Sequence, residues 1–309
     1  MIRLKFSITL EYQILSPNCD FVFNFHPALT DRQTVREESL TIAQQVLSQS
    51  LVHDGEGTRY LRVQACPGVL SVSYQGLVDI NHHYDDPGAL REMPVAELPL
   101  DVLPYIYPSR YCQSDKFASL ANYEFGTMSP GYQRVMAIRD WVTHRTKFVS
   151  GSSGSATSAL ETLVDHKGVC RDFAHLMIAM CRALNIPARF VSGIDYGADP
   201  ALGPTDFHAY VEVMLSGRWY LFDPSGVTNP MGLLRLGTGR DAADVAFANV
   251  FGNVSAQPPV ISIDALCDPE QGISLPGFTH QALSSTDQHL GVYNAVDAGL
   301  STQHIEQTF

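Results

Sequence analysis

The sequence carries little positive charge. Its 309 residues include 20 lysines and arginines against 32 aspartates and glutamates, which gives a formal net charge of −12. Unaided binding to nucleic acid or to an anionic membrane needs a basic surface, and the sequence shows no basic stripe. We therefore expect neither a nucleic-acid partner nor a membrane partner.

Long apolar runs are also absent. No run approaches the ~20 residues that a helix needs to cross a bilayer. Residues 1–10 alternate in type, which is typical of a β-strand and not of the continuous apolar core of a secretory signal. The sequence therefore predicts a cytoplasmic protein. Its 45% hydrophobic and 17% charged content is typical of a folded chain, and its length allows two domains.

Closely spaced cysteines are missing as well. Six cysteines are scattered along the chain without a CxxC pair: Cys19, Cys66, Cys112, Cys170, Cys181 and Cys267. This spacing argues against a disulfide framework and fits reduced thiols. It also disfavours a zinc site, which usually includes a close-spaced ligand pair. His82 and His83 are adjacent and would point to opposite faces of a strand, so we expect surface residues rather than joint metal ligands.

The pattern along the chain predicts four regions. Residues 1–85 hold short strand-like runs between turn residues, which indicates a small β-sandwich. Residues 86–114 are rich in proline and are expected to form an extended linker. Residues 115–265 are expected to form a second domain, and residues 266–309 a polar C-terminal tail that is partly mobile.

Individual elements follow from hydrophobic periodicity and turn signals. Strands are predicted at 4–15, 21–25, 59–64, 68–75, 77–81, 188–194, 208–215, 218–222, 245–250 and 260–263. Helices are predicted at 115–125, 131–143 and 159–164, with Trp141 as a large core side chain. The small-residue loop at 151–158 lacks the Lys-Ser/Thr ending of a phosphate-binding loop, so we interpret it as a connection.

One cysteine stands at the start of a further predicted helix. Asn185 and Pro187 end this helix, because asparagine can take the left-handed cap and proline cannot continue a helix. Cys170 would meet the positive end of the helix dipole and free backbone N–H groups, which favour a thiolate. The alternative is a free cysteine that acts as a small buried hydrophobe. The helix follows Gly168, and its apolar face is formed by Phe173, Leu176, Met177, Met180 and Leu184.

The next strands place a histidine beside an aspartate. Ser216-Gly217 is a two-residue hairpin signal, which sets Leu215 opposite Arg218. Continued along the hairpin, this register brings Tyr210 opposite Asp223.

His208 shares a face with Tyr210 and therefore lies diagonal to Asp223, within reach of a hydrogen bond. A carboxylate in that place orients an imidazole and stabilises its charged form. If the sheet packs on the helix start, Cys170 completes a Cys–His–Asp triad. Metal binding is the rival use of these residue types, but no close-spaced ligand pair supports it.

The motifs that carry these residues resemble the catalytic core of the transglutaminase-like superfamily. They are GVCRDFAHL at 168–176, ALNIPARFVSG at 183–193, HAYVEV at 208–213 and WYLFDPS at 219–225. The resemblance implies that residues 115–265 form a transglutaminase-like catalytic core with a papain-like α+β fold, in which a helix N-terminus packs on an antiparallel sheet. It also implies that the β-rich region before it is the N-terminal domain of bacterial members. Tyr210, Ser225 and Phe190 depart conservatively from the usual tryptophan, threonine and tyrosine, which leaves substrate preference open.

The same resemblance implies the chemistry. Cys170 would be the nucleophile, His208 the base and Asp223 the residue that orients it, with no metal and no organic cofactor. The expected reaction is acyl transfer from an amide of a peptide or protein through a thioester, with the backbone N–H of Cys170 as oxyanion donor. Hydrolysis, as in a cysteine peptidase or amidase, is ranked ahead of transamidation. A non-catalytic binding module is the third alternative, and the oligomeric state stays open.

Overall fold

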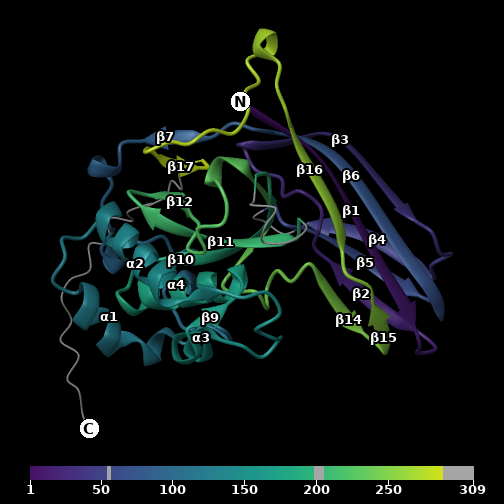
Figure 1. The fold of residues 1–309 in the computed structure, drawn as a ribbon, viewed down its shortest axis with the longest axis horizontal. Coiled ribbons are helices and arrows are strands. Elements are labelled where there is room, and N and C mark those ends of the chain that lie inside the picture. The colour runs from purple at the N-terminus through teal and green to yellow at the C-terminus, as the bar shows by residue number, and fades with distance from the viewer. Residues whose placement is uncertain (54–56, 198–204, 288–309) are drawn as a thin grey trace, which may run out of the picture.

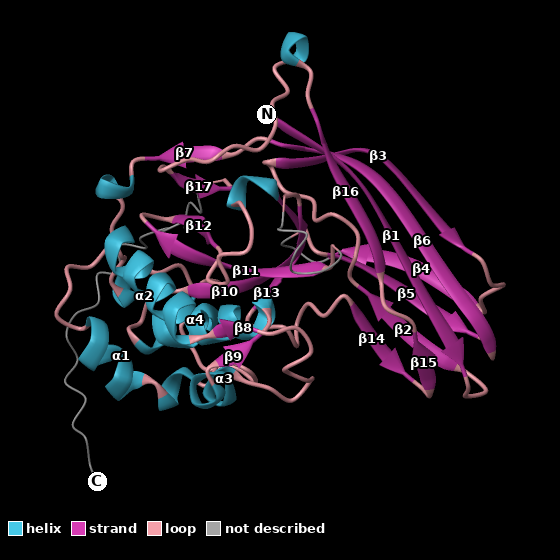
Figure 2. Ribbon diagram, viewed as in Figure 1, coloured by secondary structure: helices cyan, strands magenta, loops and turns pink. Residues whose placement is uncertain are grey.

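The computed structural model describes residues 1–53, 57–197 and 205–287 of the chain (Figure 1). A β-sandwich lies on one side of the molecule, and a second antiparallel sheet with α-helices lies on the other. Figure 2 shows that the α-helices lie together on the side of the molecule away from the sandwich. The molecule therefore has the α+β architecture with an N-terminal β-domain that the sequence predicts.

The sandwich consists of two antiparallel sheets, one in the order β15-β1-β6-β3 with β16 also paired to β1, the other in the order β14-β2-β5-β4. Alternation explains the strand formation: Ile2, Leu4 and Phe6 of β1 are buried, and the residues between them are more exposed. The strands are β1 (Ile2–Ile14), β2 (Cys19–Phe23), β3 (Gln33–Ile42), β4 (Ser48–His53), β5 (Arg59–Ala65), β6 (Gly68–Ile80), β14 (Ala248–Phe251), β15 (Val254–Ala256) and β16 (Val260–Leu266).

Strands β3 and β4 lie outside the elements that the sequence predicts. Most of β3 is exposed, so few apolar side chains mark its period. The predicted strands 68–75 and 77–81 form one strand, β6, because Gly76 continues the ladder opposite Phe6. A Cβ at Gly76 would come within 2.6 Å of the Phe6 ring, which explains a glycine in the middle of this strand.

The second sheet has the order β12-β11-β10-β13, and all its neighbours are antiparallel. Helix α4 packs on it, and the shared apolar core includes Leu176 and Met180 of the helix with Phe190 and Val211 of the sheet. The strands are β10 (Ala188–Asp195), β11 (Phe207–Leu215), β12 (Arg218–Phe222) and β13 (Leu233–Gly239), and the helices are α1 (Ala118–Phe125), α2 (Tyr132–Arg145), α3 (Ala159–Asp165) and α4 (Cys170–Ala183).

The proline-rich segment 86–114 is packed rather than extended. Two of its prolines, Pro87 and Pro104, stand in the first turns of η1 and η3, where a missing N–H costs no hydrogen bond. Leu98, Val102 and Tyr105 are buried against Met214 and Trp219 at the end of the second sheet. The segment therefore differs from the extended linker that its composition suggests. It forms the short helices η1 (Pro87–Ala89), η2 (Val95–Glu97), η3 (Leu103–Tyr105) and η4 (Ser114–Lys116).

The chain returns to the sandwich after β13. Strand β14 pairs with β2, and β15 and β16 pair with β1. In the expected division these strands belong to the second domain, 115–265, but their pairing places them in the first. Sequence periodicity reveals a strand but not its distant partner, which explains the difference. Within the expected tail, β17 (Ala282–Ser284) pairs with β7 (His83–Asp85), and residues 288–309 lie outside the described part.

Side-chain hydrogen bonds join the sandwich to the second sheet. Gln33 of β3 is buried, donates to the carbonyl of Arg235 at 2.9 Å and accepts from the Arg235 N–H at 2.9 Å. Asn24 accepts from the Ser192 hydroxyl of β10 at 3.3 Å. Apolar side chains of the sandwich and of the second sheet also pack together in one continuous core. The sandwich is therefore part of the support of β10 and β13.

The adjacent histidines differ in their surroundings. His82 is buried, which corrects the expectation of a surface residue, and burial with the nearby N-terminal ammonium lowers its pKa to about 4. His83 is partly exposed, and its Nε2 lies 2.7 Å from Asp85 Oδ2. Adjacent side chains of an extended segment point in opposite directions, which explains the contrast between the two histidines. Among the residues described, no helix is long and apolar enough to cross a membrane.

Candidate active site

The start of α4 places the thiol of Cys170. The short parallel strands β8 (Lys147–Phe148) and β9 (Lys167–Gly168) lead into this helix. Asp172 caps it, because its Oδ2 accepts from the backbone N–H of Val169 at 2.8 Å. Gly168 permits the close turn, since a Cβ there would lie 2.7 Å from Asp172 Cβ. The thiol therefore sits at a capped helix N-terminus, as the sequence predicts, and it is partly exposed.

The thiol also meets the beginning of β11. Cys170 Sγ lies 3.9 Å from the carbonyl oxygen of Phe207, the residue before His208. The contact between the helix and the sheet, which the hairpin register alone does not predict, is thus present in the fold. It brings Cys170 and His208 together, although 38 positions separate them in the sequence (208 − 170).

The β11–β12 hairpin has the predicted register. Leu215 pairs with Arg218, and the pairing continues to Val211 opposite Phe222. Ser216 and Gly217 have φ values of 48° and 78°, as a two-residue turn with positive φ at both central positions requires. Asp223 follows Phe222, the last paired residue of β12, and therefore lies on the same face of the hairpin as His208.

His208 and Asp223 face each other in a buried environment. His208 Nε2 lies 3.5 Å from Asp223 Oδ2, and the two residues are 6% and 3% exposed. Burial lowers the pKa of His208, but the charge and hydrogen bonding of Asp223, followed by those of Cys170, outweigh it and raise the pKa well above its usual value. Because Nε2 faces the carboxylate, Nδ1 is the ring nitrogen left for the thiol.

The carboxylate of Asp223 is held by four donors. Oδ1 accepts from the N–H and hydroxyl of Ser225 at 2.9 and 2.6 Å, and Oδ2 accepts from the N–H and hydroxyl of Thr228, both at 3.1 Å. Burial raises the pKa of Asp223, but the charge of His208, its hydrogen bond and those of Ser225 outweigh it and lower the pKa. This carboxyl group is therefore ionised and fixed in orientation.

Sequence reasoning missed part of this surrounding structure. Thr228 carries no motif beyond its position five residues after Asp223, and Asp195 stands at the end of a strand without a visible pattern. The loop 151–158 is anchored by Arg171, whose guanidinium donates to Ser153 Oγ at 3.1 Å and to the carbonyl of Gly154 at 2.8 Å. Trp141 is the expected packing residue, since its ring meets Phe125 edge to face at 6.1 Å.

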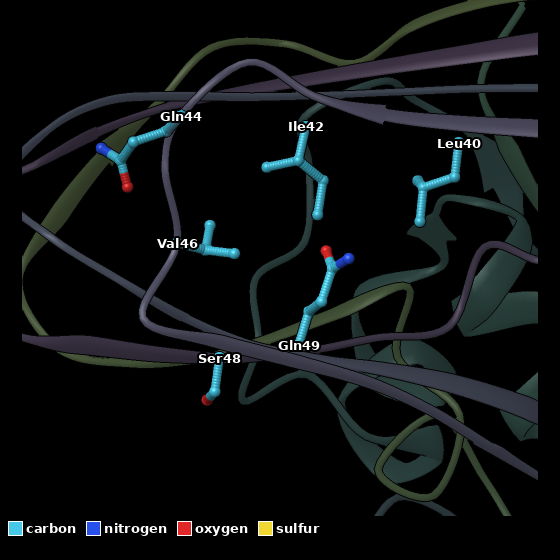
Figure 3. A pocket seen from close by; sticks show the side chains of 6 residues that line it. All are labelled: Leu40, Ile42, Gln44, Val46, Ser48 and Gln49. Carbon is cyan, nitrogen blue, oxygen red and sulfur yellow. The ribbon is translucent and has the colours of Figure 1, made fainter.

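A cavity elsewhere in the molecule belongs to the sandwich (Figure 3). It has a volume of about 400 Å³ and lies where β3 leads into β4. The cavity is lined by Leu40, Ile42, Gln44, Val46, Ser48 and Gln49. None of these residues comes from the helix–sheet junction at Cys170. Among the residues described, no cluster of three or more His, Cys, Asp or Glu side chains is placed to hold a metal ion.

The helix N-terminus on an antiparallel sheet, with a cysteine facing a histidine and an aspartate, defines a papain-like fold. Two family models match the chain: the transglutaminase-like superfamily over residues 118–224, and the bacterial transglutaminase N-terminal domain over residues 2–101. The chain belongs to the transglutaminase-like superfamily and has the N-terminal domain of its bacterial members. The resemblance inferred from the sequence motifs is confirmed.

A solved structure is similar over almost the whole chain. It is a protein from Cytophaga hutchinsonii described as a candidate cysteine protease, with 37% identity and a TM-score of 0.84 over 92% of this chain and 97% of that one. An uncharacterized Mycobacterium leprae protein is 34% identical over 117 residues, which are 36% of this chain and 42% of the relative. A Mycobacterium tuberculosis protein is 32% identical over 137 residues, 41% and 44% of the two chains. The chain thus matches less than half the length of these mycobacterial proteins.

Proposed function

We propose that the protein is a thiol-dependent enzyme that cleaves amide bonds of peptides or proteins through a thioester on Cys170. The observation that carries the proposal is the position of His208, buried between the thiol of Cys170 and the four-donor carboxylate of Asp223. A binding module that merely keeps the fold would have no need of this ionised, fully hydrogen-bonded carboxylate beside a histidine.

The raised pKa of His208 favours a thiolate–imidazolium pair. The Cys170 sulfur attacks the amide carbonyl carbon, and the carbonyl electron pair moves to oxygen. The backbone N–H of Cys170, at the free start of α4, is the proposed oxyanion donor. When the tetrahedral intermediate collapses, the C–N bond breaks and His208 gives its proton to the leaving amine. Neutral His208 then removes a proton from water, which attacks the thioester carbon and releases acid and thiol.

Asp223 serves the same cycle by holding His208. Its Oδ2 lies 3.5 Å from Nε2, and the attraction of its charge for a proton on Nε2 favours the tautomer that presents Nδ1 to the thiol. Its charge stabilises the imidazolium in the tetrahedral intermediate, where the negative charge has moved from the Cys170 sulfur to the carbonyl oxygen. Ser225 and Thr228 keep the carboxylate in place through their four hydrogen bonds.

Hydrolysis is the proposed fate of the thioester, and amine transfer is the alternative. The similarity to the C. hutchinsonii protein, described as a candidate cysteine protease, favours water as acceptor. The six free cysteines fit action in a reducing compartment such as the cytoplasm. No cofactor is invoked, and the substrate is a peptide or protein rather than a nucleic acid or a membrane lipid.

The test uses a glutaminyl peptide with and without an excess of a primary amine. Hydrolysis predicts a free acid together with the leaving amine, which is ammonia for the side-chain amide and a new peptide amino terminus for the backbone amide, with little incorporation of the added amine. Incorporation that outpaces hydrolysis would assign a transglutaminase instead. Cys170→Ala must abolish either activity, and Cys66→Ala, which removes another partly exposed thiol, must leave it intact.

A further inference from the structure

His208 has a second acidic neighbour on the strand opposite Asp223. Strand β10 pairs with β11 on the side away from β12, with Gly193 opposite His208 and Ile194 opposite Phe207. Asp195 is the last residue of β10, two positions beyond Gly193. Directly opposed residues and those two positions away share a face of the sheet. Asp195 is therefore a diagonal neighbour of His208, as Asp223 is from the other side.

Among the described residues, no hydrogen-bond donor reaches one of the two carboxylate oxygens of Asp195. The residue is 4% exposed, and its Oδ2 is buried without any donor in the described part of the chain. Other buried acids there are satisfied: Asp79 meets Arg3 and Arg36, and Glu212 meets Arg189 and Arg235. An isolated buried carboxyl group is costly, so its retention calls for a compensating interaction.

That interaction is with His208. Burial is the largest cause and, with the negative charges of Asp223 and Asp206, raises the pKa of Asp195 above its usual value; the positive charge of His208 and a backbone hydrogen bond act in the opposite direction and limit the rise. Asp195 thus responds to the charge of the histidine rather than to a hydrogen bond from it. Four charged or titratable groups surround His208: Cys170 from α4, Asp223 after β12, Asp195 on β10 and the exposed Asp206 before β11. The neighbouring strand β13 contributes Arg235, whose guanidinium is hydrogen-bonded to Glu212.

We propose that Asp195 is a positioning residue that stabilises the imidazolium of His208 through space, from the side opposite Asp223. This deepens the proposed function and rests on it. Once Asp195 is ionised, its charge keeps His208 protonated to higher pH, so the thiolate–imidazolium pair persists over a wider range. Asp195 contacts no reacting atom and acts only through His208.

The direct test is the titration of His208 in the full chain, followed by NMR of protein labelled with ¹⁵N-histidine. The signal is assigned by its loss in His208→Gln. Asp195→Asn should lower the midpoint of His208 by about one pH unit, the order expected for a charge at diagonal distance inside a protein. Asp206→Asn is the matched control, because its charge is close in the sequence but exposed; it should shift the midpoint by only a few tenths. Asp195→Glu should restore most of the wild-type midpoint.

The outcomes separate this proposal from the proposed function. An unchanged His208 midpoint in folded Asp195→Asn overturns the role of Asp195, even if the enzyme hydrolyses peptides. A lowered midpoint supports it, even if no peptide substrate is cleaved. If Asp195→Asn does not fold, Asp195→Ser carries the same measurement. Loss of folding in both neutral variants would assign Asp195 a purely structural role and overturn the proposal.

Discussion

Replacement of Asp223 by asparagine should disable the site in two ways. The carboxylate lies 3.5 Å from His208 Nε2, and both groups are buried. At an effective dielectric constant of about 20, two charges at this distance interact by about 5 kcal/mol as an upper figure. The side-chain amide of the new asparagine has a dipole that retains part of this interaction energy. We therefore expect the imidazolium to lose about 2–3 kcal/mol of stabilisation, equivalent to about a 100-fold fall in kcat.

The hydrogen bonds explain why the amide cannot adapt. Each carboxylate oxygen accepts from one backbone N–H, of Ser225 or of Thr228, and a backbone N–H cannot turn into an acceptor. In Asp223→Asn, the NH₂ group of the new side chain must therefore face one of these donors. An unmet donor of this kind costs about 1–3 kcal/mol of unfolding free energy. If the NH₂ group takes the Oδ2 position, it also presents a donor to His208 and reverses the tautomer.

The assay combines peptide hydrolysis with the pH dependence of Cys170 alkylation by iodoacetamide, read by mass spectrometry of the Cys170 peptide. Asp241→Asn is the control, because Asp241 is also buried and accepts from the backbone N–H groups of Tyr111 and Ala243, both at 2.9 Å. Asp223→Asn should narrow the pH range in which Cys170 reacts as a thiolate, and Asp241→Asn should not. Equal activity losses with unchanged alkylation profiles in both variants would refute the reasoning.

Three further predictions concern the rest of the molecule. Burial lowers the pKa of both His26 and His82 to about 4, so the unfolded chain binds more protons between pH ~6.5 and 4; the free energy of unfolding should fall over this range, by at most about 3 kcal/mol per histidine, as measured by urea denaturation at each pH. Gln33→Ala leaves the Arg235 N–H without its side-chain acceptor and should cost about 1–3 kcal/mol in the same assay. Truncation after residue 247 removes β14, β15, β16 and β17, exposes the edges of β1, β2 and β7, and should give an aggregated protein by size-exclusion chromatography.

Each of these predictions has its control. In His26→Phe and His82→Phe, the free energy of unfolding should fall less steeply between pH ~6.5 and 4 than in the wild-type protein. A wild-type slope in both variants would contradict the assignment to these histidines. Gln44→Ala, which loses hydrogen bonds at the partly exposed rim of the sandwich, should cost less than Gln33→Ala. Truncation after residue 287 keeps all described strands and should stay monodisperse; equal behaviour of the two truncations would show that β14–β17 are dispensable.

The candidate site was largely predictable because its geometry depends on local rules. The hairpin register follows from Ser216-Gly217 alone, and strand alternation then sets His208 beside Asp223. The position of Cys170 follows from helix periodicity and the N-terminal turn. The contact between α4 and β11 depends on packing between distant segments, and only the family resemblance anticipated it.

Long-range pairing explains what the sequence did not predict. The residues of β16 alternate between partial burial and exposure, a pattern that marks a strand but names no neighbour, so its place beside β1 could not be anticipated. The mostly exposed β3 offered no apolar period. Asp195 became visible only through its register with β11, because its significance lies in a missing hydrogen bond.

The measurement that tests the central claim most directly is mass spectrometry of the protein quenched in acid during turnover of a peptide amide. The account predicts a mass increase equal to the acyl group, located on the peptide that contains Cys170 and lost when the sample is treated with hydroxylamine, which cleaves thioesters. Cys170→Ala should show neither the adduct nor peptide cleavage. Cleavage that persists in folded Cys170→Ala, or an acyl group found on another residue, would contradict the account.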